Sequence, residues 1–244
     1  MRWTDSPGSP PATADLPGVS VTGKQYHRAL TVAIGERRAR MDEALAQLGQ
    51  CAPTLAEVAA RVIDVLGSGR KVLVAGNGGS AAEAQHFATE LIGRFRRERE
   101  PYAVVALTAD TAALTAIAND YGYQEVFARQ VRGLGRRDDL LLLFSTSGES
   151  ENLVRAASAA RQGGLTTVAI VGARPCRLAQ QATVTVRVPA SEAALVQELH
   201  HVVTHLLCEV IEAELARMEA TEVVAPPFPL ALHGAADKLL EGEG

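Results

Sequence analysis

VLVAGNGGSAAEAQHFATEL, residues 72–91, is the stretch that decides the fold. It opens on an apolar run, Val72–Ala75, whose length and composition are those of a buried strand. A glycine-rich turn over residues 76–79 follows, and an alanine-rich segment of good helix formers begins at Ser80, where an N-cap is expected. A strand, a glycine turn and a helix start direct backbone N–H groups towards one point. The stretch therefore predicts an anion site of the kind common in α/β proteins.

The same turn also fits the relaxed dinucleotide-binding fingerprint through Gly76, Gly78 and Ala81. That fingerprint requires an acidic residue at the end of the next strand. Here the next apolar run, residues 103–106, is separated from Asp110 by further apolar and hydroxyl residues, and no Walker lysine follows the glycines. The sequence therefore predicts no nucleotide cofactor.

Apolar runs alternate with helical patterns after this stretch. Besides residues 72–75, the runs expected as strands are 103–106, 139–144, 166–171 and 183–188. The segments expected as helices are 54–66, 111–117, 124–134, 150–161 and 192–219. Unbroken apolar strands alternating with helices indicate a parallel sheet that is covered on both faces. The expected fold is therefore α/β.

The two ends of the chain differ from this pattern. Residues 1–22 are rich in proline and small polar residues and predict a disordered tail, and residues 220–244 predict a loose C-terminal tail. The domain is thus expected over residues 23–219. A helix over residues 24–48 carries an apolar stripe but precedes every strand, so we expect the stripe to pack on another subunit.

Composition excludes several classes of function. The 244 residues carry a formal charge of −4 and no basic stripe, which argues against a nucleic-acid partner. No apolar run is long enough to span a membrane and no signal peptide is recognisable, so we expect a cytoplasmic protein without a membrane partner. Cys51, Cys176 and Cys208 lie far apart and form no CxxC pair, which argues against a cysteine metal site.

A second loop, STSGES at residues 145–150, follows the expected strand 139–144. It combines four hydroxyls with a glycine and a helix start, and such groups can bind the oxygens of a phosphate monoester. Serine-rich turns also cap helices, but a cap requires only one hydroxyl. Ligands of open parallel sheets bind at the carboxyl edge of the strands, so phosphate binding is the favoured interpretation.

Two of the expected helices carry polar side chains on one face. His86 and Glu90 lie four residues apart, and the stripe on the last helix consists of Gln197, His201 and His205. Imidazoles and a carboxylate suit zinc or a similar divalent ion. A buried histidine beside a solvated glutamate also explains the first pair. Spacing alone does not say whether His200, His201 or His205 faces a site.

Four motifs in this order, GNGGSAAEAQHFATEL, AIANDYG, STSGES and QELHHVVTH, resemble the sugar isomerase (SIS) domain and, within it, the bacterial phosphoheptose isomerases. The resemblance covers about residues 50–212. It implies a five-stranded parallel sheet in a flavodoxin-like three-layer arrangement and a homotetramer whose active sites are shared between subunits. It also implies a ketose–aldose isomerase that converts sedoheptulose 7-phosphate into a D-glycero-heptose 7-phosphate through an enediol.

The resemblance assigns residues to roles. The sugar phosphate would be lined by Asn77, Gly78, Gly79 and Ser80, together with Gln197. The sugar hydroxyls would be held by Asn119 and Asp120. The phosphate would be bound by Ser145, Thr146, Ser147 and Ser150. A zinc ion, expected to be labile, would be held by His86, Glu90, Gln197 and His205. The acid–base pair would be Glu90 and His205.

The chain departs from the family pattern at Ala194, where a polar residue is usual, so one contact to the substrate or the catalytic groups is expected to be missing. A non-catalytic branch of the family, the replication-initiator-binding proteins, is the alternative function. That branch lacks the glutamate and the final histidine of the motifs, and this sequence keeps both as Glu90 and His205.

Overall fold

The computed structural model describes residues 23–222 in two compact units, which divide between Glu43 and Ala44. The tail predicted over residues 1–22, and the part of the C-terminal tail beyond residue 222, lie outside the described residues. Residues 220–222 were expected in that tail but complete the last helix, α8 (Ala193–Glu222).

The larger unit is built on a five-stranded sheet whose strands are all parallel, in the order β2-β1-β3-β4-β5. The strands are β1 (Val72–Ala75), β2 (Val104–Ala106), β3 (Leu140–Ser145), β4 (Thr166–Val171) and β5 (Val184–Arg187). Every residue of β1 and β3 is buried, as expected of central strands that are covered on both faces. The α/β fold and the parallel sheet predicted from the sequence are confirmed.

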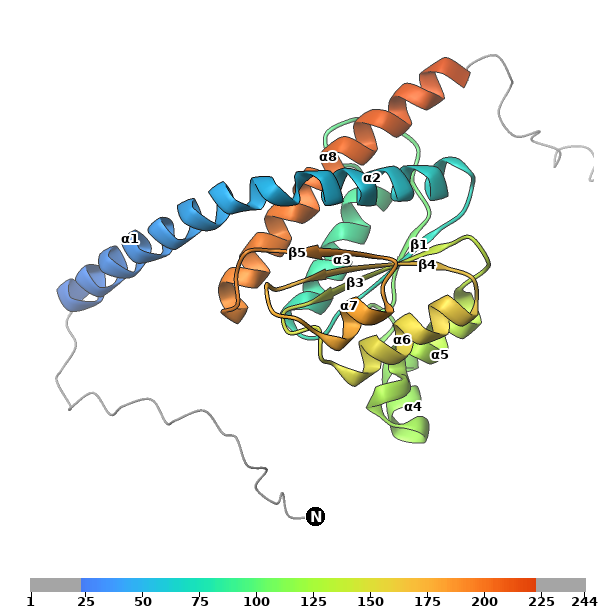
Figure 1. Cartoon of the computed structure of the whole chain (residues 1–244), viewed down its shortest axis with the longest axis horizontal. Helices are drawn as coiled ribbons and strands as arrows, with labels where there is room; N and C mark the ends of the chain where they lie inside the picture. Colours follow the sequence, from blue (N-terminus) through green and yellow to red (C-terminus); the bar gives the residue numbers. More distant parts are fainter. Residues whose placement is uncertain (1–22, 223–244) are drawn as a thin grey trace, which may run out of the picture. The chain divides into compact units, whose positions relative to one another are not determined.

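Helices cover both faces of this sheet (Figure 1). One face carries α2 (Ala52–Gly67), α3 (Gly79–Ile92) and α8. The other carries α4 (Thr111–Tyr121), α5 (Val126–Leu134), α6 (Glu151–Gln162) and α7 (Arg177–Gln181). Side chains of β3 alternate between the layers: Leu141 and Leu143 join the core under α5 and α6, whereas Phe144 packs near Phe87 of α3 and His200 of α8.

The strand order indicates where on the sheet a ligand site is expected. The chain runs from β1 to β2 on one side and then starts β3 on the other side of β1, so the connections leave in opposite directions at the β1/β3 pair. Such a switch point opens a crevice at the carboxyl ends of the two strands. The two predicted anion loops follow these two strands, as the sequence analysis expected.

Several element boundaries differ from the sequence expectations. Ser80 is not the N-cap of its helix: α3 begins at Gly79, and the N-cap is Gly78, whose φ of 55° suits a residue without a Cβ. Helix α4 continues to Tyr121. A 3-10 turn, η2 (Tyr123–Glu125), precedes α5, and the short helix α7 was not predicted.

The predicted N-terminal helix is confirmed as α1 (Gly23–Leu48), which continues from the smaller unit into the larger one. Within the smaller unit, α1 has four large apolar side chains that are exposed in this single chain, namely Tyr26, Leu30, Val32 and Ile34. None of the helices in residues 23–222 is both long enough and apolar enough to cross a bilayer.

Candidate active site

The glycine loop after β1 is held by its own backbone. The N–H of Ser80 donates to the carbonyl of Asn77 at 3.0 Å, and the N–H of Ala81 donates to that of Gly78 at 3.0 Å. The backbone of Gly78 and Gly79 is exposed, whereas Ser80 is only 4% exposed. The loop therefore offers its backbone, rather than the Ser80 side chain, to an anion at the start of α3.

The side chain of Asn77 is fixed by a polar network that the sequence did not predict. Its amide makes a reciprocal pair with the buried Asn152 of α6: Asn77 Nδ2 donates to Asn152 Oδ1 at 2.9 Å, and Asn152 Nδ2 donates to Asn77 Oδ1 at 2.8 Å. The hydroxyl of Tyr123 donates to the same Oδ1 at 3.0 Å. Asn152 and Tyr123 thus position the residue that the resemblance assigns to the substrate.

The serine loop after β3 uses two of its hydroxyls to form its own turn. Ser145 Oγ accepts the N–H of Gly148 at 2.9 Å, and Ser147 Oγ accepts the N–H of Glu149 at 3.2 Å. Ser150 is the N-cap of α6, but its side chain makes no capping hydrogen bond. The hydroxyls of Thr146 and Ser150 therefore do not cap the helix. The serine loop fits a phosphate-binding role better than a purely capping role.

Asn119 and Asp120 lie in the last turn of α4 rather than in a loop. Both are exposed, and Asn119 Nδ2 donates to Asp120 Oδ1 at 2.8 Å. Tyr123, which follows α4, donates a hydrogen bond to Asn77 and so connects this part of the chain to the glycine loop. The predicted role of Asn119 and Asp120 in holding sugar hydroxyls stays a prediction.

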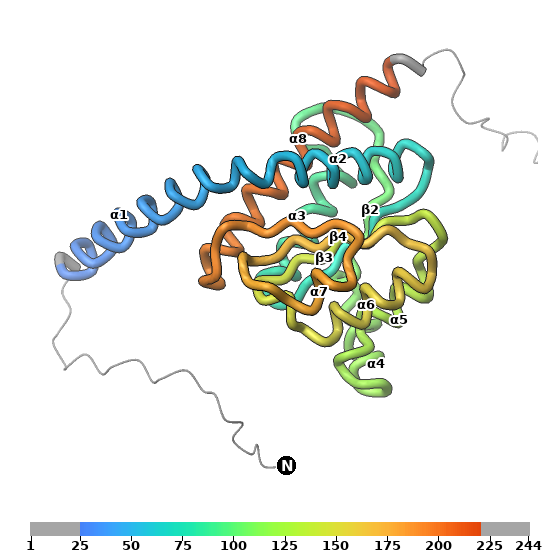
Figure 2. The backbone as a smooth tube through the Cα atoms, viewed as in Figure 1, coloured from blue at the N-terminus to red at the C-terminus, as the bar shows by residue number. Residues whose placement is uncertain are grey.

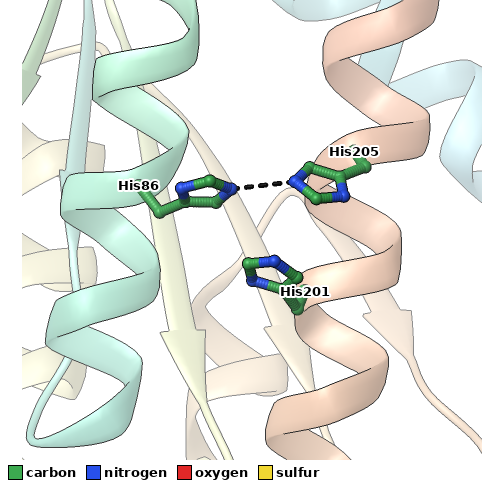
Figure 3. A group of neighbouring side chains, drawn as sticks. All are labelled: His86, His201 and His205. Carbon is green, nitrogen blue, oxygen red and sulfur yellow. Dashed lines mark hydrogen bonds between the residues drawn. The ribbon is translucent and has the colours of Figure 1, made fainter.

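A histidine cluster forms where α3 and α8 pack together, two helices that lie far apart in sequence but side by side on one face of the sheet (Figure 2). His86 Nε2 and His205 Nε2 are 2.9 Å apart, and one of them must donate a hydrogen to the other. His201 stacks on His86 with ring centroids 4.6 Å apart and meets His205 edge-on at 4.5 Å (Figure 3). Ligand nitrogens of the three histidines lie within 4.8 Å of one another.

The structure resolves the ambiguity that spacing left open on α8. His200 is fully buried and packs against Phe144, and burial lowers the pKa of its imidazole to about 4, so it is a neutral core residue. His201 and His205 both face α3. The resemblance selected only His205, and the structure adds His201 to the group.

The other predicted metal ligands lie at either end of this cluster. Glu90 Oε1 is 3.7 Å from His86 Nε2, one turn along α3. Gln197 lies against the glycine loop, because a Cβ on Gly79 would sit 2.5 Å from its Nε2. Gln197 thus connects the cluster helix to the anion loop. Ala194 lies one turn earlier, with its N–H 3.0 Å from a carboxylate oxygen of Glu192.

The electrostatics favour a neutral imidazole at His205. Burial, followed by the neighbouring His201 and His86, lowers the pKa of His205, and the carboxylates Glu90 and Glu83 only partly oppose this. A neutral imidazole is the form that binds a metal. Three converging imidazoles with a carboxylate at the edge form a donor set that fits zinc.

Known proteins place the chain in a family. The SIS domain family matches residues 38–172. The chain is 45% identical over 192 residues to a phosphoheptose isomerase from a Bradyrhizobium species, an alignment that covers 78% of this chain and 97% of that relative. The chain belongs to the phosphoheptose isomerase family. A phosphoheptose isomerase from Streptomyces coelicolor is 51% identical over 159 residues, covering 65% of this chain and 69% of the relative.

Solved structures of this family share the architecture. A phosphoheptose isomerase from Francisella tularensis superposes with a TM-score of 0.72 at 35% identity, over 75% of this chain and 98% of that one. The enzyme from Neisseria gonorrhoeae gives a TM-score of 0.71 at 37% identity, over 75% of this chain and 99% of that one. The resemblance seen in the sequence is thus confirmed at the level of the family and its fold.

Sequence reasoning missed Glu83, Tyr123 and Asn152 at this candidate site. Glu83 had a detectable signal, because it lies three residues before His86 and so shares its helix face. No sequence signal pointed to Tyr123 or Asn152, since each contacts Asn77 from an element that is distant in sequence.

Proposed function

We propose that the chain is a ketose–aldose isomerase that converts sedoheptulose 7-phosphate into a D-glycero-heptose 7-phosphate. Membership of the phosphoheptose isomerase family gives the reaction class. The observation that carries the proposal is that Glu90 of α3 and His205 of α8 both lie next to His86: His86 Nε2 is 3.7 Å from Glu90 Oε1 and 2.9 Å from His205 Nε2.

This arrangement suits an enediol mechanism. Moving a carbonyl from C2 to C1 removes a proton from C1 and returns one to C2, and a carboxylate near the sugar can carry it. Glu90 is assigned that carbon-to-carbon transfer. His205 is assigned the hydroxyl protons, because imidazole exchanges protons near neutral pH. The backbone of the loop at residues 76–79 and the hydroxyls of the loop at residues 145–150 hold the phosphate end.

Zinc is proposed as a labile partner of this site, held by His86, Glu90, Gln197 and His205. The chemistry it supplies when bound is polarisation of the substrate carbonyl. A carboxylate that ligates a metal is a weaker base, so ligation and proton transfer by Glu90 are alternative roles. We expect added zinc to raise activity and a chelator to lower it without unfolding the chain.

A homotetramer with active sites at the subunit interfaces is also proposed. The exposed apolar side chains of α1 support it, because an unpaired apolar helix face needs a partner. Light scattering at micromolar concentration should show four chains. A monomer with full activity would overturn this assembly.

The reaction itself is tested by incubating the protein with sedoheptulose 7-phosphate and zinc and following the product by NMR. An aldose heptose 7-phosphate is expected, and the spectrum also assigns the C2 epimer. Binding of the ketose without turnover would overturn the enzyme assignment. It would favour the non-catalytic branch of the family, for which a pull-down of a protein partner is the next experiment.

A further inference from the structure

Glu83 is a buried carboxylate beside the histidine cluster. The residue is 9% exposed, and it lies on the same face of α3 as His86. Its Oε2 is 3.2 Å from His201 Nδ1. Its Oε1 is buried and has no hydrogen-bond donor among residues 23–222. A carboxylate removed from water in this way is costly unless a positive charge compensates it.

Within residues 23–222, the hydrogen-bond partner of that carboxylate is His201, and this contact links Glu83 to the cluster. Because Nδ1 faces Glu83, a hydrogen on Nδ1 can be donated to the carboxylate, which leaves the lone pair of Nε2 free. The ring stacks on His86 at an interplanar angle of 18° and is half exposed, so it is open to an incoming ion (Figure 3).

We infer that His201 is an additional zinc ligand and that Glu83 is its positioning residue. Metal-binding histidines usually donate their other ring N–H to a carboxylate, which fixes the tautomer and makes the ligand more basic. The positive charge of the ion, transmitted through the imidazole, compensates the buried carboxylate. The inference rests on the zinc site of the proposed function and adds His201 and Glu83 to it.

A competing arrangement has the same geometry without a metal. A protonated His201 and an ionised Glu83 would then form a simple ion pair, and zinc affinity would be independent of both residues. The stripe of His201 and His205 on α8 and the position of His86 argue for the metal, because ligand atoms of three histidines converge within 4.8 Å.

The test is zinc affinity of the full chain, measured by competition with a chromophoric chelator. Replacing the carboxylate partner of a metal-bound histidine typically weakens binding by about 10–100-fold, and this is expected of Glu83→Gln. His201→Ala should weaken binding by at least about tenfold for the same reason. His27→Ala, at an exposed position of α1, and Glu57→Gln, at an exposed position of α2, are the matched controls and should bind zinc as the wild type does.

A double variant separates positioning from simple packing. Since Glu83 acts through His201, the double variant should bind zinc no more weakly than His201→Ala alone, which is a non-additive result. Cobalt(II) gives a second signature, because loss of one imidazole should change the visible absorption bands of the bound ion in His201→Ala. Circular dichroism and the melting temperature of each variant verify that the fold is kept.

The outcomes divide clearly. Wild-type protein that binds no zinc, or a His201→Ala variant with wild-type affinity and an unchanged cobalt spectrum, would overturn the inference. Turnover of sedoheptulose 7-phosphate is measured separately. Zinc binding that depends on His201 and Glu83 without turnover would support this inference while removing the proposed function. Turnover together with a zinc affinity that is independent of His201 would support the proposed function and overturn this inference.

Discussion

The backbone turns of the two anion loops are closed by hydrogen bonds within a few residues, whereas the histidine cluster joins His86 to His205 across 119 positions of sequence. In the loops, glycine backbone and hydroxyls make the turn locally. The cluster exists only because α3 and α8 pack together on one face of the sheet. Damage to a loop should therefore weaken phosphate binding first, and damage to the helix packing should weaken the chemistry.

The largest effect is expected at the buried ion pair between Glu212 of α8 and Arg99 in the segment that follows α3. Glu212 accepts the backbone N–H groups of Phe95, Arg96 and Arg97 and pairs with Arg99, and both side chains of the pair are 2% exposed. Glu212→Gln should lower the free energy of unfolding by about 3–5 kcal/mol, because a buried charge loses its partner. Urea denaturation measures it. Glu209→Gln, which breaks an exposed pair with Arg96, should change stability by about 1 kcal/mol or less.

The same pair predicts a pH dependence. Burial alone would raise the pKa of Glu212, but the backbone N–H groups of Arg96, Phe95 and Arg97 and the charge of Arg99 outweigh it and lower the pKa below the ordinary 4.5. The stabilisation is therefore present above about pH 4.5, the unfolded value, and is lost as the pH falls through the lower folded value. The stability difference between wild type and Glu212→Gln should shrink in that acid range. A constant difference would contradict this.

The next effect tests the chemistry of the cluster. Glu90→Gln should reduce turnover by at least ~10²-fold if Glu90 is the general base, while the anion loops still bind the sugar phosphate. Steady-state kinetics and isothermal titration with sedoheptulose 7-phosphate measure the two properties. Glu98→Gln, a highly exposed glutamate just beyond α3, is the control and should keep full activity. Parallel loss of binding and turnover would mean that the loops and the cluster are not independent.

A loop variant tests the other side of the comparison. Gly148 has a φ of +69°, and a Cβ there would press against Cys176, so Gly148→Ala should cost about 1–3 kcal/mol of stability. The KM should rise, because the serine loop is displaced, while zinc affinity is kept. Gly133→Ala, in α5 with open space around it, is the control and should be neutral or stabilising. Loss of zinc affinity in Gly148→Ala would break the comparison.

The smallest effect is expected at the hydroxyl that supports Asn77. Tyr123→Phe removes one hydrogen bond, which is worth about 0.5–1.5 kcal/mol, so the KM should rise by about 2–10-fold with kcat nearly unchanged. Tyr26→Phe, on the exposed face of α1, controls for the substitution itself. A fall in kcat instead would show that the glycine loop also affects the chemical step.

The sequence by itself determined the five strands and the two anion loops that follow two of them, whereas the pairing of β1 with β3, which brings the loops to one edge, came from the structure. These features are local: apolar runs form buried strands, and glycine and serine turns set their own backbone. It also placed Gln197, His201 and His205 on one stripe, which the structure confirms. Boundaries that depend on backbone detail were less predictable, as the displacement of the N-cap from Ser80 to Gly78 shows.

Only the tertiary structure decided which histidine of α8 enters the site. His200 and His201 are neighbours in sequence but point about 100° apart around the helix, so the rotation of α8 against α3 assigns one to the core and the other to the cluster. The same packing brings Glu83 to His201. Helical periodicity defines a stripe, but the orientation of that stripe is fixed by contacts between distant segments, which no local pattern contains.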